Sequence, residues 1–269
     1  MFQPQQQIGP YTLMRLLGRG GFGEVWLAEK RGALMTTQVA VKLPLDPNPD
    51  LNAIRHEAQT WLRASGHPNV LPVIEADIYD GQVVIVSEYA SAGSLESWLK
   101  QHGGKAPSIE LALTMTSGIL AGLEHLHHLP TPIVHRDLKP DNVLLQGELP
   151  RLTDFGISRV LKTTAQTQHA SGTPHYMPPE AFAGRYSAQS DIWAAGVMLY
   201  QMLSGKLPFP QSDLPSLYGA ILTGTPAPLP ADVPPELKTV VAKALSKDPV
   251  QRFASAADMR AGLKPMPLK

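Results

Sequence analysis

The stretch His135-Arg136-Asp137-Leu138-Lys139-Pro140-Asp141-Asn142 is followed a short way along the chain by Asp154-Phe155-Gly156. Together the two stretches supply the carboxylates of Asp137 and Asp154, an amide and an ammonium close in sequence. Carboxylate and amide oxygens are ligands of Mg²⁺, and a lysine can oppose the charge of a phosphate. Such a set could also position a hydroxyl nucleophile, so it indicates a site for phosphoryl transfer.

A glycine-rich run lies upstream, at Gly18-Arg19-Gly20-Gly21-Phe22-Gly23. It stands between the β-rich residues 11–17 and 25–28, with a further β-rich run at 39–43, which predicts antiparallel strands joined by glycines. Glycines allow the backbone to lie close over phosphates because they have no Cβ. A dinucleotide-binding unit shares this spacing, but it requires a helix after the glycines, where this sequence predicts a strand.

The ordered set of motifs resembles the eukaryotic-like Ser/Thr protein kinase family in its bacterial form, over about residues 11–264. The set includes Val39-Ala40-Val41-Lys42, the stretches quoted above and the run 172–180. This resemblance implies an α+β, bilobal fold, with a five-stranded antiparallel sheet and one helix in the N-lobe and a mainly helical C-lobe. The implied organisation is a flexible segment 1–10, an N-lobe at about 11–87, a hinge at about 88–92, a C-lobe at about 93–264 and a tail 265–269.

The same resemblance assigns roles to individual residues. Asp137 would accept the hydroxyl proton, Lys139 would face the γ-phosphate, and Lys42 would grip the other phosphates with Glu57 as its partner on a helix at 52–64. Asn142 and Asp154 would hold Mg²⁺, with Mn²⁺ as an alternative ion. The expected ATP contacts share a place in the glycine-rich hairpin, the adenine pocket or the hinge: Leu17, Gly18, Gly20, Gly21, Gly23, Val25, Ala40, Lys42, Glu88, Ala90 and Leu144, with the small Ser87 at the gatekeeper position.

Composition narrows the class of protein further. Lysine plus arginine equals aspartate plus glutamate at 23 each, so no basic surplus favours nucleic acid or an anionic membrane. The chain has no cysteine, which excludes disulfides and a cysteine nucleophile. Residues 1–10 do not resemble a signal peptide, and the longest apolar stretch, 192–203, is too short to span a bilayer. We therefore expect a cytoplasmic protein with no membrane span.

The second half of the chain predicts helices. Apolar residues at helical spacing predict a long helix at 111–126, a buried helix at 192–203 and closing helices at 237–245 and 256–263, with a proline-rich loop at 224–235. His125, His127 and His128 suggest a metal site, but the sequence supplies no matching cluster of carboxylates or cysteines. Satisfied or exposed histidines are the commoner case.

The run Gly172-Thr173-Pro174-His175-Tyr176-Met177-Pro178-Pro179-Glu180 resembles the family's peptide-docking element, with Pro178 where alanine is usual. Lys139 and Thr173 resemble the Ser/Thr and not the tyrosine-specific pattern, so the implied partners are proteins with Ser or Thr acceptors. Glu180 is the expected ion-pair partner of Arg252. Loop hydroxyls are candidates for phosphorylation by a second copy during transient self-association, with Arg136 and Arg159 as ligands of the phosphate: Thr167 first, then Thr164, Thr163 and Ser171.

Two other functions stay open at this stage. A pseudokinase scaffold would be signalled by loss of Lys42, Asp137, Asn142 or Asp154, and all four residues are present. A small-molecule phosphotransferase on the same fold would lack the docking run 172–180, which is also present. Incubation with labelled ATP and a generic basic protein would separate all three.

Overall fold

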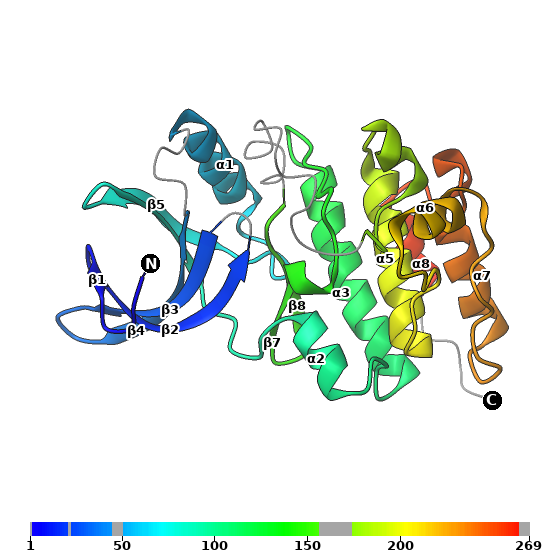
Figure 1. Cartoon of the computed structure of the whole chain (residues 1–269), viewed down its shortest axis with the longest axis horizontal. Coiled ribbons are helices and arrows are strands. Elements are labelled where there is room, and N and C mark those ends of the chain that lie inside the picture. Colours follow the sequence, from blue (N-terminus) through cyan, green and yellow to red (C-terminus); the bar gives the residue numbers. More distant parts are fainter. Residues whose placement is uncertain (1, 21–22, 45–50, 156–173, 264–269) are drawn as a thin grey trace. The chain divides into compact units, whose positions relative to one another are not determined.

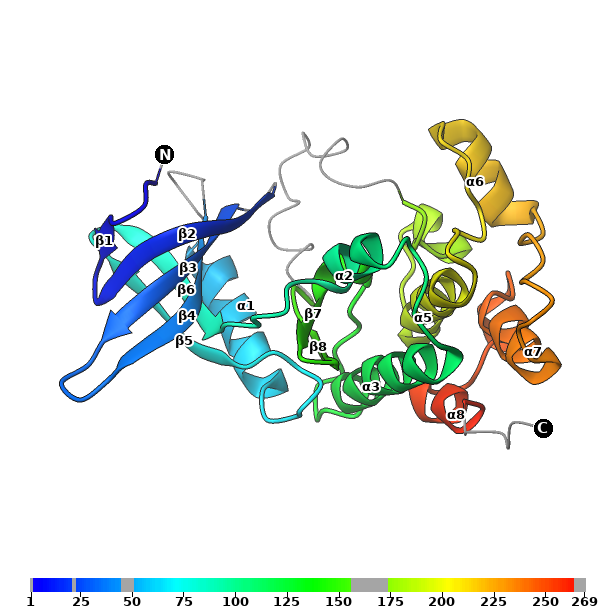
Figure 2. The same cartoon turned by 90° about the horizontal axis from the view of Figure 1, so that it is seen from below.

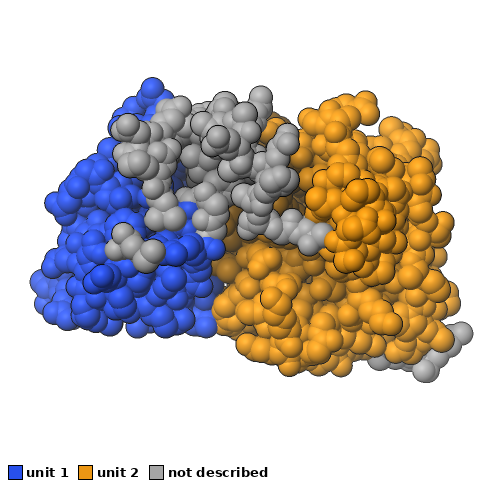
Figure 3. Space-filling view, in the orientation of Figure 1, with its two compact units in different colours: residues 1–66, 71–91, 157–172 blue, residues 67–70, 92–156, 173–269 orange. Residues whose placement is uncertain are grey.

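The computed structural model describes residues 2–20, 23–44, 51–155 and 174–263, without the side chains of residues 20, 53, 54, 56 and 57. The described chain forms two compact units (Figure 3). Unit 1 contains the residues up to 66 together with 71–91, and unit 2 contains 67–70 and the described residues from 92 onward.

Unit 1 is built on a six-stranded antiparallel sheet with the order β1-β2-β3-β4-β6-β5 (Figure 1). Helix α1 (Leu51–Ala64) packs against β5 (Figure 2). The strands are β1 (Gln7–Ile8), β2 (Tyr11–Gly20), β3 (Gly23–Arg31), β4 (Thr36–Leu43), β5 (Val73–Tyr79) and β6 (Gln82–Glu88). The antiparallel sheet and the helix predicted at 52–64 are confirmed.

The expected count of five strands is wrong by one, because the sequence analysis placed no strand before Tyr11. Strand β1 pairs with the start of β2, and its Ile8 is buried in the core at 3% exposure. A two-residue strand has no alternation to detect, so its burial depends on the tertiary structure. Strand β5 begins at Val73, directly after Pro72, which has no N–H to donate to a ladder.

One buried apolar cluster of unit 1, called its core below, lies on one face of the sheet. Alternate residues of the central strands fill it, since successive side chains of a strand point to opposite faces. The buried cluster consists of Ile8, Tyr11, Leu13, Trp26, Ala28, Val39, Val41, Leu43, Val84 and Val86. The intervening residues of these strands are therefore left for the opposite face.

Unit 2 is mainly helical, as expected. Helix α3 (Ile109–His127) packs against α5 (Ala188–Ser204) and against α8 (Ala256–Ala261). A short hairpin of β7 (Val143–Gln146) and β8 (Leu149–Leu152) packs on α3. The other helices are α2 (Leu95–Gln101), α6 (Leu214–Thr223) and α7 (Pro235–Ala244), with 3₁₀ turns η1 (Pro140–Asn142), η3 (Pro179–Ala183) and η4 (Pro249–Gln251).

Helix α5 is the buried axis of unit 2, which confirms the prediction from its apolar sequence. Nearly every residue from Ser190 to Leu203 is buried, and α5 ends at Gly205 in the left-handed region with φ 74°. Helices α2 and α6 are absent from the sequence-based expectations, because both are short and amphipathic and take their caps from Ser94 and Asp213. No described helix has the length and apolar character needed to cross a membrane.

Candidate active site

The sheet face opposite the core of unit 1 carries the expected nucleotide contacts. Val25 is the register partner of Lys42, and Ala40 is the partner of Ser87. Cross-strand partners share a face, and these four residues alternate with the core residues Trp26, Val41 and Val86. The structure therefore brings Val25, Ala40, Lys42 and Ser87 together on one surface of unit 1.

The glycine-rich hairpin extends from the same strands. Gly18 pairs with Val25, and Gly20 pairs with Gly23 across the hairpin. Gly23 has φ 143°, and a Cβ built there would lie 2.3 Å from the carbonyl oxygen of Leu43. Only glycine fits this position, which keeps the β3 end of the hairpin close against β4. Leu17 beside it is 36% exposed.

The residues expected in the hinge follow β6. Glu88 donates its backbone N–H to the carbonyl oxygen of Pro72 at 3.2 Å, and Ala90 is buried at 8% exposure. Within unit 2, Ser94 forms a β-bridge with Leu144, which is half-buried. The backbone before Ser91 is therefore hydrogen-bonded within unit 1, and the backbone after Ser91 is hydrogen-bonded within unit 2.

The catalytic-loop candidates of unit 2 form one hydrogen-bonded group. Lys139 Nζ lies 3.2 Å from Asp137 Oδ2. Asn142 Nδ2 donates to the same carboxylate oxygen at 3.2 Å and to the backbone oxygen of Asp137 at 2.7 Å. The Asp137 side chain is nevertheless 41% exposed. An oriented, ionisable carboxylate that solvent and substrate can reach is suited to accept a proton.

The oxygens needed for a divalent cation lie beside this group. Among the described residues, both side-chain hydrogen bonds of Asn142 use its Nδ2, and Oδ1 could therefore serve as a ligand. Thr153 donates its backbone N–H to the carbonyl oxygen of Asn142 at 3.1 Å, so Asp154 follows directly next to Asn142. An amide oxygen and a carboxylate are hard donors that fit Mg²⁺.

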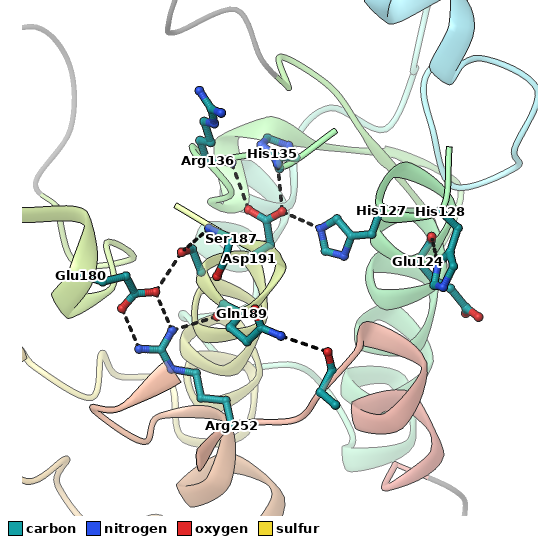
Figure 4. A network of polar contacts seen from close by, with 12 residues as sticks. Glu124, His127, His128, His135, Arg136, Glu180, Ser187, Gln189, Asp191 and Arg252 are labelled. Atoms are coloured by element: carbon teal, nitrogen blue, oxygen red, sulfur yellow. Dashed lines mark hydrogen bonds and ion pairs between the residues drawn. The ribbon is translucent and has the colours of Figure 1, made fainter. Parts of the chain in front are cut away.

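Asp191, in the first turn of α5, holds the backbone of the catalytic loop (Figure 4). Its Oδ2 accepts the N–H of His135 at 2.8 Å, and its Oδ1 accepts the N–H of Arg136 at 3.0 Å. His127 Nε2 lies 2.8 Å from Oδ2, and Asp191 itself is 1% exposed. This buried carboxylate therefore joins α3, α5 and the loop at one point.

Two residues of the site lie in the left-handed backbone region, which is unfavourable for residues with a Cβ. Arg136 has φ 69° and Asp154 has φ 57°. Such conformations persist where the surroundings enforce them. The hydrogen bonds that Asp191 accepts supply this constraint at Arg136.

His135 is fully buried beside this loop. Its ring packs edge-on against the ring of Phe155, with the ring centroids 6.0 Å apart, and burial holds the pKa of His135 below its ordinary value.

The ion pair between Glu180 and Arg252 is present in the structure. It is bidentate, with both N···O distances at 2.8 Å, and Glu180 also accepts a hydrogen bond from Ser190 (Figure 4). Arg252 is 3% exposed and donates as well to the carbonyl oxygens of Ser246 and Gln189. Burial alone would raise the pKa of Glu180, but these donors outweigh it and hold the pKa below 4.5.

The histidines of α3 have partners other than a metal. His127 pairs with Asp191, His128 donates from Nδ1 to the carbonyl oxygen of Glu124, and His125 stacks on His67 with ring centroids 5.0 Å apart. Within the described residues, no group of three histidine, cysteine or acidic side chains could hold a metal ion.

Several expected site residues lie outside the described residues. They are Gly21, Arg159, Thr163, Thr164, Thr167, Ser171 and Thr173, and for Glu57 and Gly20 only the backbone is described. Arg136 is described, and its guanidinium lies 5.8 Å from the centre of the Tyr186 ring.

Sequence reasoning missed the role of Asp191 and its partner His127. The predicted buried helix begins at residue 192 and gives Asp191 no role, whereas α5 begins earlier, with Ser187 as its N-cap in a capping box with Ser190. One signal was available in the sequence. A carboxylate inside a helix that is apolar almost all round must be buried, and a buried carboxylate requires several donors.

The fold and this site define the class of protein. Residues 11–261 match the family described as the protein kinase domain, and the chain belongs to that family, whose members use ATP and a divalent metal. The chain is 36% identical over 271 residues to serine/threonine-protein kinase PknD of Mycobacterium tuberculosis, covering 96% of this chain and 40% of that protein.

Two other similar protein kinases come from a different bacterium and from a fish. Serine/threonine-protein kinase PrkC of Bacillus subtilis is 32% identical over 271 residues, covering 95% of this chain and 40% of that protein. Serine/threonine-protein kinase Nek8 of Danio rerio is 33% identical over 249 residues, covering 90% of this chain and 35% of that protein. The chain therefore spans at most 40% of the length of each of these relatives.

Proposed function

We propose that this chain transfers the γ-phosphate of ATP to Ser or Thr hydroxyls of protein substrates. The observation that carries the proposal is the group formed by Asp137, Lys139 and Asn142, with N···O distances of 3.2 Å to one carboxylate oxygen. This group supplies, at one place, an acceptor for a hydroxyl proton, a cation for the transferring phosphate and an amide oxygen for a metal.

The residues of unit 2 would divide the work as follows. Asp137 orients the acceptor hydroxyl and takes its proton as the oxygen attacks phosphorus. Lys139 faces the phosphoryl oxygens, whose charge must be balanced through the transition state. Asn142 and Asp154 would hold Mg²⁺, or alternatively Mn²⁺, which when bound neutralises charge on the β- and γ-phosphates.

In unit 1, Lys42 would bind the α- and β-phosphates, with Glu57 orienting it. Leu17, Val25 and Ala40 would cover the adenine from the sheet face described above, and Leu144 of unit 2 would be its other apolar contact. The backbone of Glu88 and Ala90 would bind the adenine edge. The position of Lys42 beside Val25 in the register supports this division.

We also propose that the enzyme phosphorylates its own loop, with Thr167 as the first candidate and Thr163, Thr164 and Ser171 as others. A phosphate brings close to two negative charges, and Arg136, held next to Asp137, together with Arg159 would balance them. Phosphorylation would then order the docking run around Thr173.

The direct test is Asp137→Asn, assayed with labelled ATP on a basic protein and on free small-molecule alcohols. We expect turnover on the protein to fall at least about a hundredfold, because the variant cannot accept the proton. Turnover of Lys42→Met should fall by a similar factor, because the variant lacks the ammonium that would bind the α- and β-phosphates. Melting temperatures close to that of the wild type would show that both variants are folded.

Three results would change the assignment. Near wild-type turnover in Asp137→Asn would remove its role as the base. Nucleotide binding without turnover in the wild type would favour the pseudokinase alternative. Phosphorylation of small alcohols but not of any protein would favour a small-molecule phosphotransferase.

A further inference from the structure

A fully buried carboxylate lies at the base of the glycine-rich hairpin, on the core face of the sheet. Glu24 is 0% exposed and is the register partner of Leu43. It continues the row of Trp26 and Ala28, which belong to the apolar core. An acidic side chain at such a position is unusual, because burying a charge is unfavourable unless it is paired.

Two donors compensate this carboxylate. Arg19, from the opposite stem of the hairpin, donates to Oε1 through Nε at 2.9 Å and through a second guanidinium nitrogen. Trp26 donates its indole N–H to Oε2 at 2.9 Å. Burial alone would raise the pKa of Glu24, but the bonds from Arg19 and Trp26 outweigh it and lower the pKa. Glu24 is therefore an anion held from both sides.

The pair spans the glycine turn. Arg19 and Glu24 are cross-strand partners, and Gly20 and Gly23 form the next pair toward the turn. On the β3 side, Gly23 packs closely on Leu43 and Trp26 is fixed in the core. The β3 stem is thus anchored independently of the ion pair.

The β2 stem has much less support. Strand β1 pairs with β2 only at Tyr11 and Thr12, so near the turn β2 is an edge strand of the described sheet. The β2–β3 ladder also contains two register irregularities, between Leu13 and Arg15 and between Leu16 and Gly18. The bond from Arg19 to Glu24 is the side-chain connection of this loosely held stem to the anchored stem.

We infer that Arg19 and Glu24 are positioning residues that lock the two stems of the hairpin so that the glycine backbone is preorganised to bind the phosphates of ATP. This inference rests on the proposed function. Replacing a buried ion pair by hydrophobic residues is often neutral or stabilising, so stability alone does not explain a buried Glu24 paired with an Arg19 whose side chain is 46% exposed. The ion pair adds a defined register, since the carboxylate can be satisfied only when the guanidinium lies opposite.

The test compares the full chain with Arg19→Met, Arg19→Lys, Glu24→Gln and the double variant Arg19→Met/Glu24→Gln. Arg31→Met is the control, because Arg31 is an exposed arginine at the far end of β3. The measurements are amide hydrogen exchange of the hairpin without nucleotide, the dissociation constant of a non-hydrolysable ATP analogue with Mg²⁺, and KM and kcat for ATP.

We expect Arg19→Met to speed exchange in the hairpin and to weaken nucleotide binding roughly tenfold, an amount typical of a close charge pair. KM for ATP should rise more than kcat falls. Arg19→Lys should recover part of the affinity, and Arg31→Met should match the wild type. Since both single changes remove the same bond, the double variant should lose less than the sum of the two losses.

Several outcomes would overturn the inference. Unchanged exchange in Arg19→Met would show that the pair does not lock the stems. If hydrogen exchange in Arg19→Met is faster but the nucleotide affinity and KM equal those of the wild type, the Arg19–Glu24 pair is only structural and does not position the phosphate-binding backbone. If Arg19→Met does not fold, the double variant Arg19→Met/Glu24→Gln replaces it as the test, because it contains no unpaired buried charge. Wild-type nucleotide affinity in the double variant would refute the inference. Absence of nucleotide binding in the wild type would instead refute the proposed function, and the positioning role with it, while the exchange data still report on the lock.

Discussion

At the scale of the residue, the buried charges of Arg252 and Asp191 are each matched by several hydrogen-bond partners. Arg252 bonds Glu180 through two nitrogens and reaches the carbonyl oxygens of Ser246 and Gln189. Asp191 accepts two backbone N–H groups and contacts His127. Such saturation is required because an unpaired buried charge is much less stable than a paired one.

Removing Arg252 should therefore destabilise unit 2 strongly. We expect Arg252→Met to lower the free energy of unfolding by about 3–5 kcal/mol, because it leaves Glu180 with an uncompensated charge. Urea denaturation measures this. The control is Arg260→Met, which removes the ion pair to Glu124 between side chains that are 40% and 32% exposed. A surface pair of that kind contributes about 1 kcal/mol or less. Equal losses in the two variants would contradict the prediction.

Lys247 gives the protein a pH dependence above neutrality. Its Nζ donates to the carbonyl oxygens of Ala220 and Ile221, and it lies over the Phe209 ring at 4.2 Å. Burial, followed by the charge of Arg252, lowers its pKa from 10.5 to about 8. Between these two values the unfolded chain binds more protons than the folded chain at this residue, so stability rises with pH across that window.

The comparison that isolates Lys247 is wild type against Lys247→Met, by urea denaturation at pH 7 and pH 10. We expect the stability of the wild type relative to the variant to increase from pH 7 to pH 10, because the penalty for burying a charged amine disappears as the amine loses its proton. A difference that is the same at both pH values would show that Lys247 keeps an ordinary pKa in the folded protein.

At the scale of the element, helix α5 packs closely against α7 at Gly196. A Cβ built at Gly196 would lie 2.7 Å from Cβ of Ala244. Gly219, in α6, would have no atom within 4 Å of such a Cβ. The two glycines therefore have the same helical backbone but opposite surroundings.

Alanine substitution at these two glycines should change the free energy of unfolding in opposite directions. Gly219→Ala should raise the free energy of unfolding by up to about 1 kcal/mol, because alanine loses less entropy in a helix. Gly196→Ala gains the same entropic stabilisation, but overpacking against Ala244 should outweigh it. The net result should be a free energy of unfolding lower by about 1–3 kcal/mol. Thermal unfolding of both variants checks this. Stabilisation by Gly196→Ala would show that α7 can move away from α5 at little cost.

At the scale of the whole molecule, the proposed loop phosphorylation requires that one copy act on another. An Asp137→Asn chain cannot modify itself, yet its loop hydroxyls remain acceptors. Incubated with catalytic amounts of wild type and ATP, it should gain phosphate on residues among Thr163, Thr164, Thr167 and Ser171, at a rate that rises with wild-type concentration. Phosphopeptide mass spectrometry measures this.

The control for that experiment is an Asp137→Asn chain in which the four loop hydroxyl residues are replaced by alanine, which should stay unmodified in this segment. An unmodified loop in fully active wild type would refute loop phosphorylation. So would wild-type turnover in an active chain that carries the same four alanines. Modification of wild type alone, never of Asp137→Asn, would mean that each molecule modifies only itself.

The sequence by itself determined the class of fold, the order of the motifs and much of the secondary structure. The apolar run 192–203 predicts a buried helix because no amphipathic face remains, and α5 is buried accordingly. The β-rich runs 25–28 and 39–43 predict strands, and both form, as parts of β3 and β4, with Val25 paired to Lys42. These features are local, since periodicity and turn chemistry act within a few residues of the chain.

Only the tertiary structure decided which polar groups meet. Asp191 contacts the N–H groups of His135 and Arg136 more than 50 residues away, and it meets His127 across 64 residues. The burial of Glu24, the strand β1 and the close approach at Gly196 likewise depend on neighbours that no local pattern specifies. The physical reason is that burial and charge pairing are properties of the packed chain, whereas a sequence pattern reports only the preference of a segment for one conformation.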